Sequence, residues 1–183
     1  MPRTFEVRQE FDAPAAQVRE MMVDPAYIRM RAERTGAISV EVEIVGADEI
    51  EGADEVSTDG AAREGVRLQI TRVLPTQGAP TFARGLLGES ITVTESQAWQ
   101  PAASGVATAT MEASFGSMLR LTGVIELSDA QSGSVAITRA TCKASVPLVG
   151  GKVESLVEQQ VTEYLVYEQQ VARDWLREHG NHP

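Results

Sequence analysis

Five polar residues interrupt stretches of the sequence that otherwise predict buried faces. Arg72 follows the apolar positions of one alternating stretch, and Glu95 and Gln97 follow those of another. Gln9 lies between two apolar positions of a third alternating stretch, and Glu168 interrupts an apolar stripe at helical spacing. Because an unpaired buried charge is costly, we expect Arg72 to pair with Glu95 or Glu168 if these side chains point inward, where they would line one end of a pocket. The alternative is that a bulge or strand end turns Arg72 and Glu95 outward and that Glu168 lies at the helix edge.

Two kinds of chemistry are open to these residues. In an enzyme of the cyclase or dehydratase type, Glu95 or Glu168 would act as a general base with a pKa raised by burial, and Arg72 or Tyr164 would stabilise an enolate. In a binding protein, the same side chains would orient one polar group of an apolar ligand. Two titratable groups within hydrogen-bonding reach of one point in a cavity would favour the enzyme, whereas Arg and Glu side chains that satisfy only each other would not. The sequence assigns no residue a catalytic role.

Other catalytic and metal-binding chemistries lack the residues that they need. The two histidines, His179 and His182, lie in the terminal stretch 179–183, which we expect to fray, so neither a Ser-His-Asp triad nor an ordered histidine metal site can be assembled. Cys142 stands among small apolar residues, and nothing nearby in the sequence would lower its pKa, which predicts an inert packing residue. We therefore expect no metal and no cofactor.

The composition is that of an ordinary globular protein. The chain has 183 residues, 43% hydrophobic and 23% charged, which favours a single domain over residues 1–183. Its formal net charge of -10 argues against a nucleic-acid partner and predicts repulsion from an anionic membrane surface. A single cysteine, the lack of a secretory leader and the lack of a window of ~20 apolar residues predict a cytoplasmic protein that is not embedded in a membrane. The sequence leaves open whether it is a monomer or a homodimer.

One stretch of the sequence is strongly acidic. Residues 46–65 contain seven Asp and Glu residues against Arg63 alone. Such a run is typical of a flexible, solvated loop, and the repeating Asp pattern of a calcium loop is missing. The part from Asp48 to Asp59 could also serve as the contact surface of a protein-interaction module of the co-chaperone type.

Periodicity predicts the elements that position these residues. Alternation predicts strands over residues 4–11, 38–44, 66–74, 89–99, 106–115, 119–128 and 134–146, with turn residues between the later ones. Two short helices, with Asp12 and Asp24 as candidate caps, would separate the first two strands. From Pro147 to Glu178 the spacing predicts one helix on the order of 40 Å long. Its stripe of apolar residues, which includes Val157, Val161 and Tyr164, is expected to be buried.

The inward faces of the strands opposite this helix are apolar but mostly small. Such faces would either pack closely against the helix or leave a cavity beneath it, and we expect a cavity because a long helix cannot follow a curved sheet along its whole length. The predicted pocket-lining residues are Arg72, Glu95, Gln97, Ala109, Met111, Phe115, Ala140, Cys142, Val157, Val161, Tyr164 and Glu168.

Four phrases carry a resemblance to a known family: Phe11-Asp-Ala-Pro-Ala, Asp24-Pro-Ala-Tyr-Ile, Leu87-Gly-Glu-Ser-Ile-Thr-Val-Thr-Glu and Val146-Pro-Leu-Val-Gly-Gly-Lys-Val-Glu. With the order of elements, they resemble an uncharacterised bacterial branch of the START-like, or birch-pollen-allergen-like, superfamily (SRPBCC), which includes polyketide cyclases and lipid-transfer domains. The resemblance implies an α+β helix-grip fold, in which a curved seven-stranded antiparallel sheet surrounds a long C-terminal helix with an elongated cavity between them. It also implies a binding or carrier role for an apolar small molecule such as a lipid, polyketide or quinone. The superfamily shares no catalytic residue that could be carried over.

Overall fold

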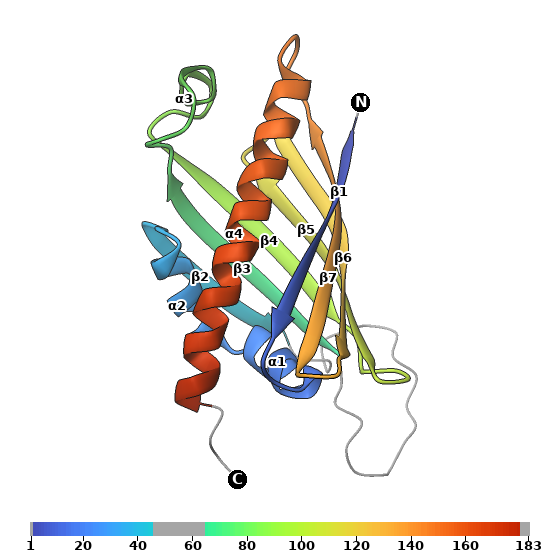
Figure 1. Cartoon of the computed structure of the whole chain (residues 1–183). Coiled ribbons are helices and arrows are strands. Elements are labelled where there is room, and N and C mark those ends of the chain that lie inside the picture. Colours follow the sequence, from blue (N-terminus) through green and yellow to red (C-terminus); the bar gives the residue numbers. More distant parts are fainter. Residues whose placement is uncertain (1, 46–64, 180–183) are drawn as a thin grey trace.

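Seven antiparallel strands form one sheet in the order β1-β7-β6-β5-β4-β3-β2 in the computed structural model, which describes residues 2–45 and 65–179. The strands are β1 (Arg3–Phe11), β2 (Ser39–Val45), β3 (Val66–Pro75), β4 (Ser90–Trp99), β5 (Val106–Phe115), β6 (Leu119–Asp129) and β7 (Ser134–Ala144). The helices are α1 (Ala15–Met22), α2 (Pro25–Arg34), α3 (Thr81–Leu87) and α4 (Gly150–His179). The sheet curves around α4 (Figure 1), which confirms the α+β helix-grip fold expected from the sequence.

The two short helices α1 and α2 connect β1 and β2, as predicted, but only one of the two predicted caps forms. Asp24 caps α2, because its Oδ1 accepts a 2.7 Å hydrogen bond from a backbone N–H of the first turn. The prediction for Asp12 is wrong, since α1 begins without a side-chain cap. Asp129, at the end of β6, accepts the N–H of Ala15 at 2.7 Å instead, so a residue distant in sequence holds the start of α1.

Helix α3 lies where the sequence predicts only turns, in the connection between β3 and β4. Pro80 directly precedes it, which is compatible with a helix start because the first turn needs no N–H at that point. Ala83 is buried, while Phe82 stays 39% exposed. Seven residues with one buried position give too weak a periodic signal to distinguish a short helix from a turn.

The apolar stripe of α4 is buried only in part, which corrects the expectation of complete burial. Val171 is 1% exposed, whereas Val157, Val161 and Tyr164 are half-buried. The helix runs as one unbroken rod that packs on β1 and β7. Val157 and Val161 pack in part against the core and in part line clefts beneath the helix.

Gly123, in the middle of β6, lies where β6 approaches β7 closely. It pairs with Ala140 of β7, and a Cβ placed on it would lie 2.3 Å from the carbonyl oxygen of Arg139. Only glycine permits so close an approach between the two strands. A larger residue would push β6 and β7 apart at this position.

The hydrophobic core has two parts, which lie toward opposite ends of the sheet. At the end beside α1, which we call the α1 end, large side chains such as Phe11, Tyr27 and Trp99 are fully buried. At the opposite end, beside α3 and here called the α3 end, small buried residues such as Ala113 and Cys142 meet half-buried valines of α4. The α1 end therefore buries the largest side chains, whereas the α3 end combines Phe5, Leu119 and Leu121 with small residues and half-buried valines. No helix in the described ranges is long and apolar enough to cross a membrane.

Candidate functional site

Arg72 and Glu95 form the buried ion pair that the sequence suggests. The two residues lie on neighbouring strands, β3 and β4, and their Nη2 and Oε2 atoms are 2.7 Å apart. Their side chains are only 8% and 9% exposed. The alternative that a bulge turns them outward is therefore wrong.

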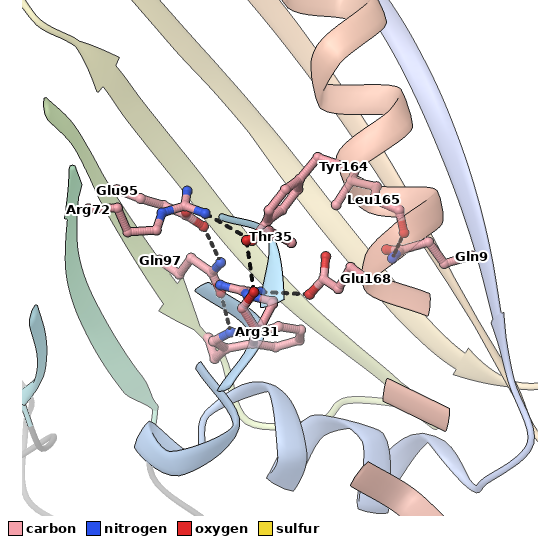
Figure 2. Close-up of polar contacts among 10 residues, drawn as sticks. Gln9, Arg31, Thr35, Arg72, Glu95, Gln97, Tyr164, Leu165 and Glu168 are labelled. Carbon is pink, nitrogen blue, oxygen red and sulfur yellow. Dashed lines mark hydrogen bonds and ion pairs between the residues drawn. The ribbon is translucent and has the colours of Figure 1, made fainter. Parts of the chain in front are cut away.

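A ladder of hydrogen bonds continues from this pair along the inward face of β4 (Figure 2). Gln97 donates from Nε2 to Oε1 of Glu95 at 2.6 Å, and the indole of Trp99 donates to Oε1 of Gln97 at 2.9 Å. The ladder follows from the period of two in a strand, which places residues 95, 97 and 99 on the same face. Each carboxylate oxygen of Glu95 thus has a donor, one from Arg72 and one from Gln97.

Arg31 of α2 is a functional residue that the sequence reasoning missed. Its Nη1 lies 2.6 Å from Oε1 of Glu168, and the two side chains are 6% and 4% exposed. Glu168 therefore pairs with Arg31 rather than Arg72. Together, Arg31, Arg72, Glu95 and Glu168 form a buried quartet in which two positive and two negative charges balance. Gln9, from β1, donates separately to the carbonyl of Leu165 at 2.8 Å.

Tyr164 connects the two halves of the quartet. Its hydroxyl oxygen accepts a 2.9 Å hydrogen bond from Nη1 of Arg72. Its ring centroid is 5.3 Å from the guanidinium carbon of Arg72 and 5.9 Å from that of Arg31, within cation–π range of both. Burial raises the pKa of Tyr164, although both arginines act to lower it, so the phenol keeps its proton at neutral pH. Within the described ranges no protein group accepts that proton, which leaves the hydroxyl free to donate.

The charges of the quartet hold Glu95 ionised. Burial alone would raise the pKa of this carboxyl, but the positive charges of Arg72 and Arg31 and the hydrogen bond from Gln97 lower it below its ordinary value. The expectation of a Glu95 base with a pKa raised by burial is therefore wrong. Each carboxylate has a guanidinium partner, which disfavours general-base chemistry, although the Nε atoms of Arg31 and Arg72 are buried without a hydrogen-bond partner among the described residues.

A cavity of about 80 Å³ lies between the quartet and the apolar faces of α4 and the sheet. A cavity of this size holds several water molecules but is too small to enclose a whole lipid. The elongated internal cavity implied by the family resemblance is therefore reduced to a small enclosed space. Of the predicted lining residues, those around this cavity are Arg72, Glu95, Gln97, Met111, Phe115, Ala140, Val161, Tyr164 and Glu168.

Two open clefts adjoin this cavity along α4. A cleft of about 620 Å³ shares Arg72, Phe115, Val161 and Tyr164 with it and opens between α2, β3 and α4. A second, apolar cleft of about 180 Å³ shares Phe115 and Val157 with the first and lies at the α3 end. The space beneath α4 thus continues from the quartet to the α3 end, and Val157 lines it as predicted.

Two predicted lining residues belong to the packed core instead. Ala109 is 1% exposed in the core of the α1 end, and Cys142 is fully buried at the α3 end. Burial, followed by the negative charges of Glu154 and Glu158, raises the pKa of the Cys142 thiol to about 11, which confirms that it is inert. Across the described part of the chain, His, Cys, Asp and Glu side chains form no cluster of three or more that could hold a metal ion. The acidic stretch lies almost wholly outside the described residues.

Comparisons with known proteins agree with this fold. The model of the family described as "Protein of unknown function (DUF2505)" matches residues 6–176. An uncharacterised protein of Mycobacterium tuberculosis is 25% identical over 179 residues, covering 96% of this chain and 98% of that protein. The structure is similar to that of the ZhuI aromatase/cyclase from Streptomyces sp. R1128, with a TM-score of 0.62, 12% identity and coverage of 99% of this chain and 97% of the other.

Ara h 8.0201 is also similar, with a TM-score of 0.52, 14% identity and coverage of 98% of this chain and 100% of the other. At such identities the likeness is one of fold. It confirms the START-like, birch-pollen-allergen-like architecture that the sequence resembles, a fold shared with Ara h 8.0201 and with an aromatase/cyclase.

Proposed function

The chain belongs to the DUF2505 family of proteins of unknown function, and we propose that it binds a mainly apolar small molecule between α4 and the sheet, as a binding or carrier protein. One observation carries the proposal: the apolar space beneath α4 leads to a single, buried, charge-balanced polar end. Binding sites for small molecules combine apolar walls with a few fixed polar groups in this way.

The clefts suit the body of such a ligand. Their apolar lining comes from Leu74, Phe115, Val157 and Val161, and the enclosed cavity beyond them admits only a small terminal group. The ligand would therefore lie along α4 with one end pointing toward Tyr164.

The polar end favours a neutral hydrogen-bond acceptor over a carboxylate. Arg72 and Arg31 are already neutralised by Glu95 and Glu168, so an added carboxylate would bring an uncompensated charge into a buried site. Tyr164 offers a free O–H donor whose oxygen is polarised by Arg72. A ketone, quinone or ester oxygen would accept this proton without adding a charge.

The two other hypotheses gain less support. The fold is shared with an aromatase/cyclase, but the ion-paired Glu95, with its lowered pKa, is a poor general base. A co-chaperone-type contact through Asp48 to Asp59 would involve residues outside the described ranges.

Displacement of the neutral fluorescent probe N-phenyl-1-naphthylamine tests the location of the site. Val161→Trp would fill the space beneath α4, because Val161 lines both the cavity and the large cleft. Val166→Trp is the matched control, since Val166 lies on the same helix and is 53% exposed. We expect Val161→Trp to weaken probe binding at least tenfold and Val166→Trp to leave it unchanged. Equal binding by both variants, with both folded by circular dichroism, would show that the probe does not enter this space.

Three competitors of similar size test the polar end: 2-acetylnaphthalene, 2-naphthoate and 2-ethylnaphthalene. The ketone should displace the probe at the lowest concentration. Tyr164→Phe should weaken ketone binding about 2- to 10-fold, as expected for one neutral hydrogen bond, and leave 2-ethylnaphthalene unaffected. A preference for the carboxylate in the wild-type protein would contradict the assignment of a neutral acceptor.

A further inference from the structure

The connection between β7 and α4 presents a leucine directly to solvent at the α3 end. Leu148 is fully exposed, and its φ of 67° lies in the left-handed region that residues other than glycine rarely adopt. An exposed leucine alone would mean little. A leucine that is held outward on a strained turn, in a position that favours glycine, calls for a physical reason.

A second exposed apolar side chain stands at the same end, across the apolar cleft. Phe82 of α3 is 39% exposed. The cleft is lined on one side by Ala83 of α3 and on the other by Val146 and Val153, which flank the turn that carries Leu148. Figure 1 shows α3 and the β7–α4 connection together at this end of the molecule. Leu148 and Phe82 therefore lie close in sequence to residues that line this cleft, which are Val146 and Ala83.

The local charge at this end is opposite to that of the whole chain. The sequence contains two lysines, Lys143 and Lys152, and they lie on either side of Leu148. Both are exposed, as is Arg84 of α3, and none of these three cations forms an ion pair with another described residue. Glu89 is the exposed acid beside α3.

Other acids near this end are already paired or buried. Glu158 pairs with Arg3, and Glu112 pairs with Arg120. Glu154 is buried and accepts the backbone N–H of Ala144. Lys143, Lys152 and Arg84 thus outnumber Glu89 and Glu154, so this end has a small excess of positive charge, although the chain as a whole carries a charge of -10.

We propose that the α3 end docks reversibly on an anionic lipid bilayer surface. Leu148 and Phe82 enter the interfacial region, while Lys143, Lys152 and Arg84 contact acidic headgroups. The contact is too small and too interrupted for a stable protein interface, which needs about 800 Å² of surface from each partner, but isolated protruding side chains can enter a fluid interface. The repulsion expected from the net charge acts over the whole molecule, and it is weakest when the positive end faces the surface. Docking in this orientation places the opening of the apolar cleft against the membrane.

Co-sedimentation with vesicles tests this proposal. Wild-type protein should sediment with vesicles of phosphatidylcholine and phosphatidylglycerol at a 7:3 ratio in low salt, and much less with pure phosphatidylcholine. Leu148→Glu should lower the partition coefficient at least tenfold, and Lys143→Glu combined with Lys152→Glu should lower it by a similar factor. Val166→Glu is the matched control, because Val166 is 53% exposed in the middle of α4, away from this end, and should bind as wild type does.

Two results would overturn the proposal: no binding to anionic vesicles, or equal binding by Leu148→Glu and Val166→Glu. Leu148→Glu should still bind N-phenyl-1-naphthylamine normally in the absence of vesicles. Loss of vesicle binding with intact probe binding separates a failure of docking from a failure of the ligand site.

Discussion

Replacing Arg31 with methionine should destabilise the protein strongly. The variant removes one partner of a 2.6 Å ion pair whose side chains are 6% and 4% exposed, and it leaves the Glu168 carboxylate buried without its cation. Breaking a buried pair in this way typically costs about 3–5 kcal/mol, a large share of the total stability of a domain. Methionine keeps much of the volume and a good helix propensity, so the loss would report mainly the unpaired charge.

A second ion pair between the same two helices supplies the control. Nη1 of Arg34 in α2 and Oδ2 of Asp174 in α4 are 2.8 Å apart, nearly as close as the buried pair at 2.6 Å, but their side chains are 39% and 37% exposed. Solvent screens such a pair, so Arg34→Met should change stability far less than Arg31→Met. The double variant Arg31→Met with Glu168→Leu removes both buried charges and should regain much of the loss.

Urea unfolding followed by tryptophan fluorescence measures these differences. With a slope of about 2 kcal/mol per M, Arg31→Met should lower the midpoint by roughly 1.5–2.5 M. The reasoning is refuted if Arg31→Met and Arg34→Met lower the midpoint equally, or if the double variant is as unstable as the sum of its two single variants. Either result would mean that water reaches the Arg31–Glu168 pair.

Two further predictions concern the charge of Glu95 and the backbone of the turn at Gly133. The pKa of Glu95 is lower in the folded protein than in the unfolded chain, so its contribution is present above the ordinary carboxyl value of about 4.3 and is lost as the pH falls through the folded value. Glu95→Gln should therefore be less stable than wild type at pH 7 in urea unfolding, and the difference should shrink below about pH 4; a difference that stays constant from pH 7 to pH 3 contradicts the lowered pKa. Gly133→Ala should unfold at far lower urea than Gly78→Ala, because both glycines have a φ near +90° but only at Gly133 would a Cβ lie 1.9 Å from a backbone oxygen, that of Phe11. Equal midpoints would show that the turn after β6 can move away from β1.

The sheet and the long helix could be predicted because their signals repeat over many residues. Six of the strands follow one another as a meander, and each alternates between apolar and polar positions over seven residues or more. The helix α4 has 30 residues without proline, and glycine occurs only in its first two positions. The short α3 could not be predicted, because seven residues with one buried position carry almost no periodic information.

The sequence predicted some residues of the buried polar site and missed others. Arg72, Glu95 and Gln97 could be found because each occupies an inward position of a strand with clear alternation. Arg31 was missed because α2 carries three arginines, and arginine on a short helix is usually exposed. Charge balance was the available signal: two inward carboxylates, Glu95 and Glu168, faced one inward cation, so a second buried cation was needed.

The size of the cavity depends on curvature, which the alternation of the strands does not determine. Gly123 itself has no side chain, and a Cβ at this position would lie 2.3 Å from the carbonyl oxygen of Arg139. The space measures about 80 Å³ near the quartet and about 620 Å³ in the cleft along the half-buried valines of α4. Sequence patterns specify which residues face inward but not how far apart the two walls stand.

The position of the quartet between the two halves of the core explains how one chain combines a stable fold with an unfilled interior. At the α1 end, Trp99, Tyr27 and Phe11 are buried almost completely. This burial offsets the free-energy cost of removing the four charges of the quartet from water. At the α3 end, the valines of α4 that pack against the core are only half-buried, which leaves apolar surface in contact with water. The quartet holds α2, α4, β3 and β4 together at the boundary, so α4 does not need to pack on β3 to stay in place. A ligand that covers these half-buried valines would therefore remove from water apolar surface that the protein itself leaves uncovered.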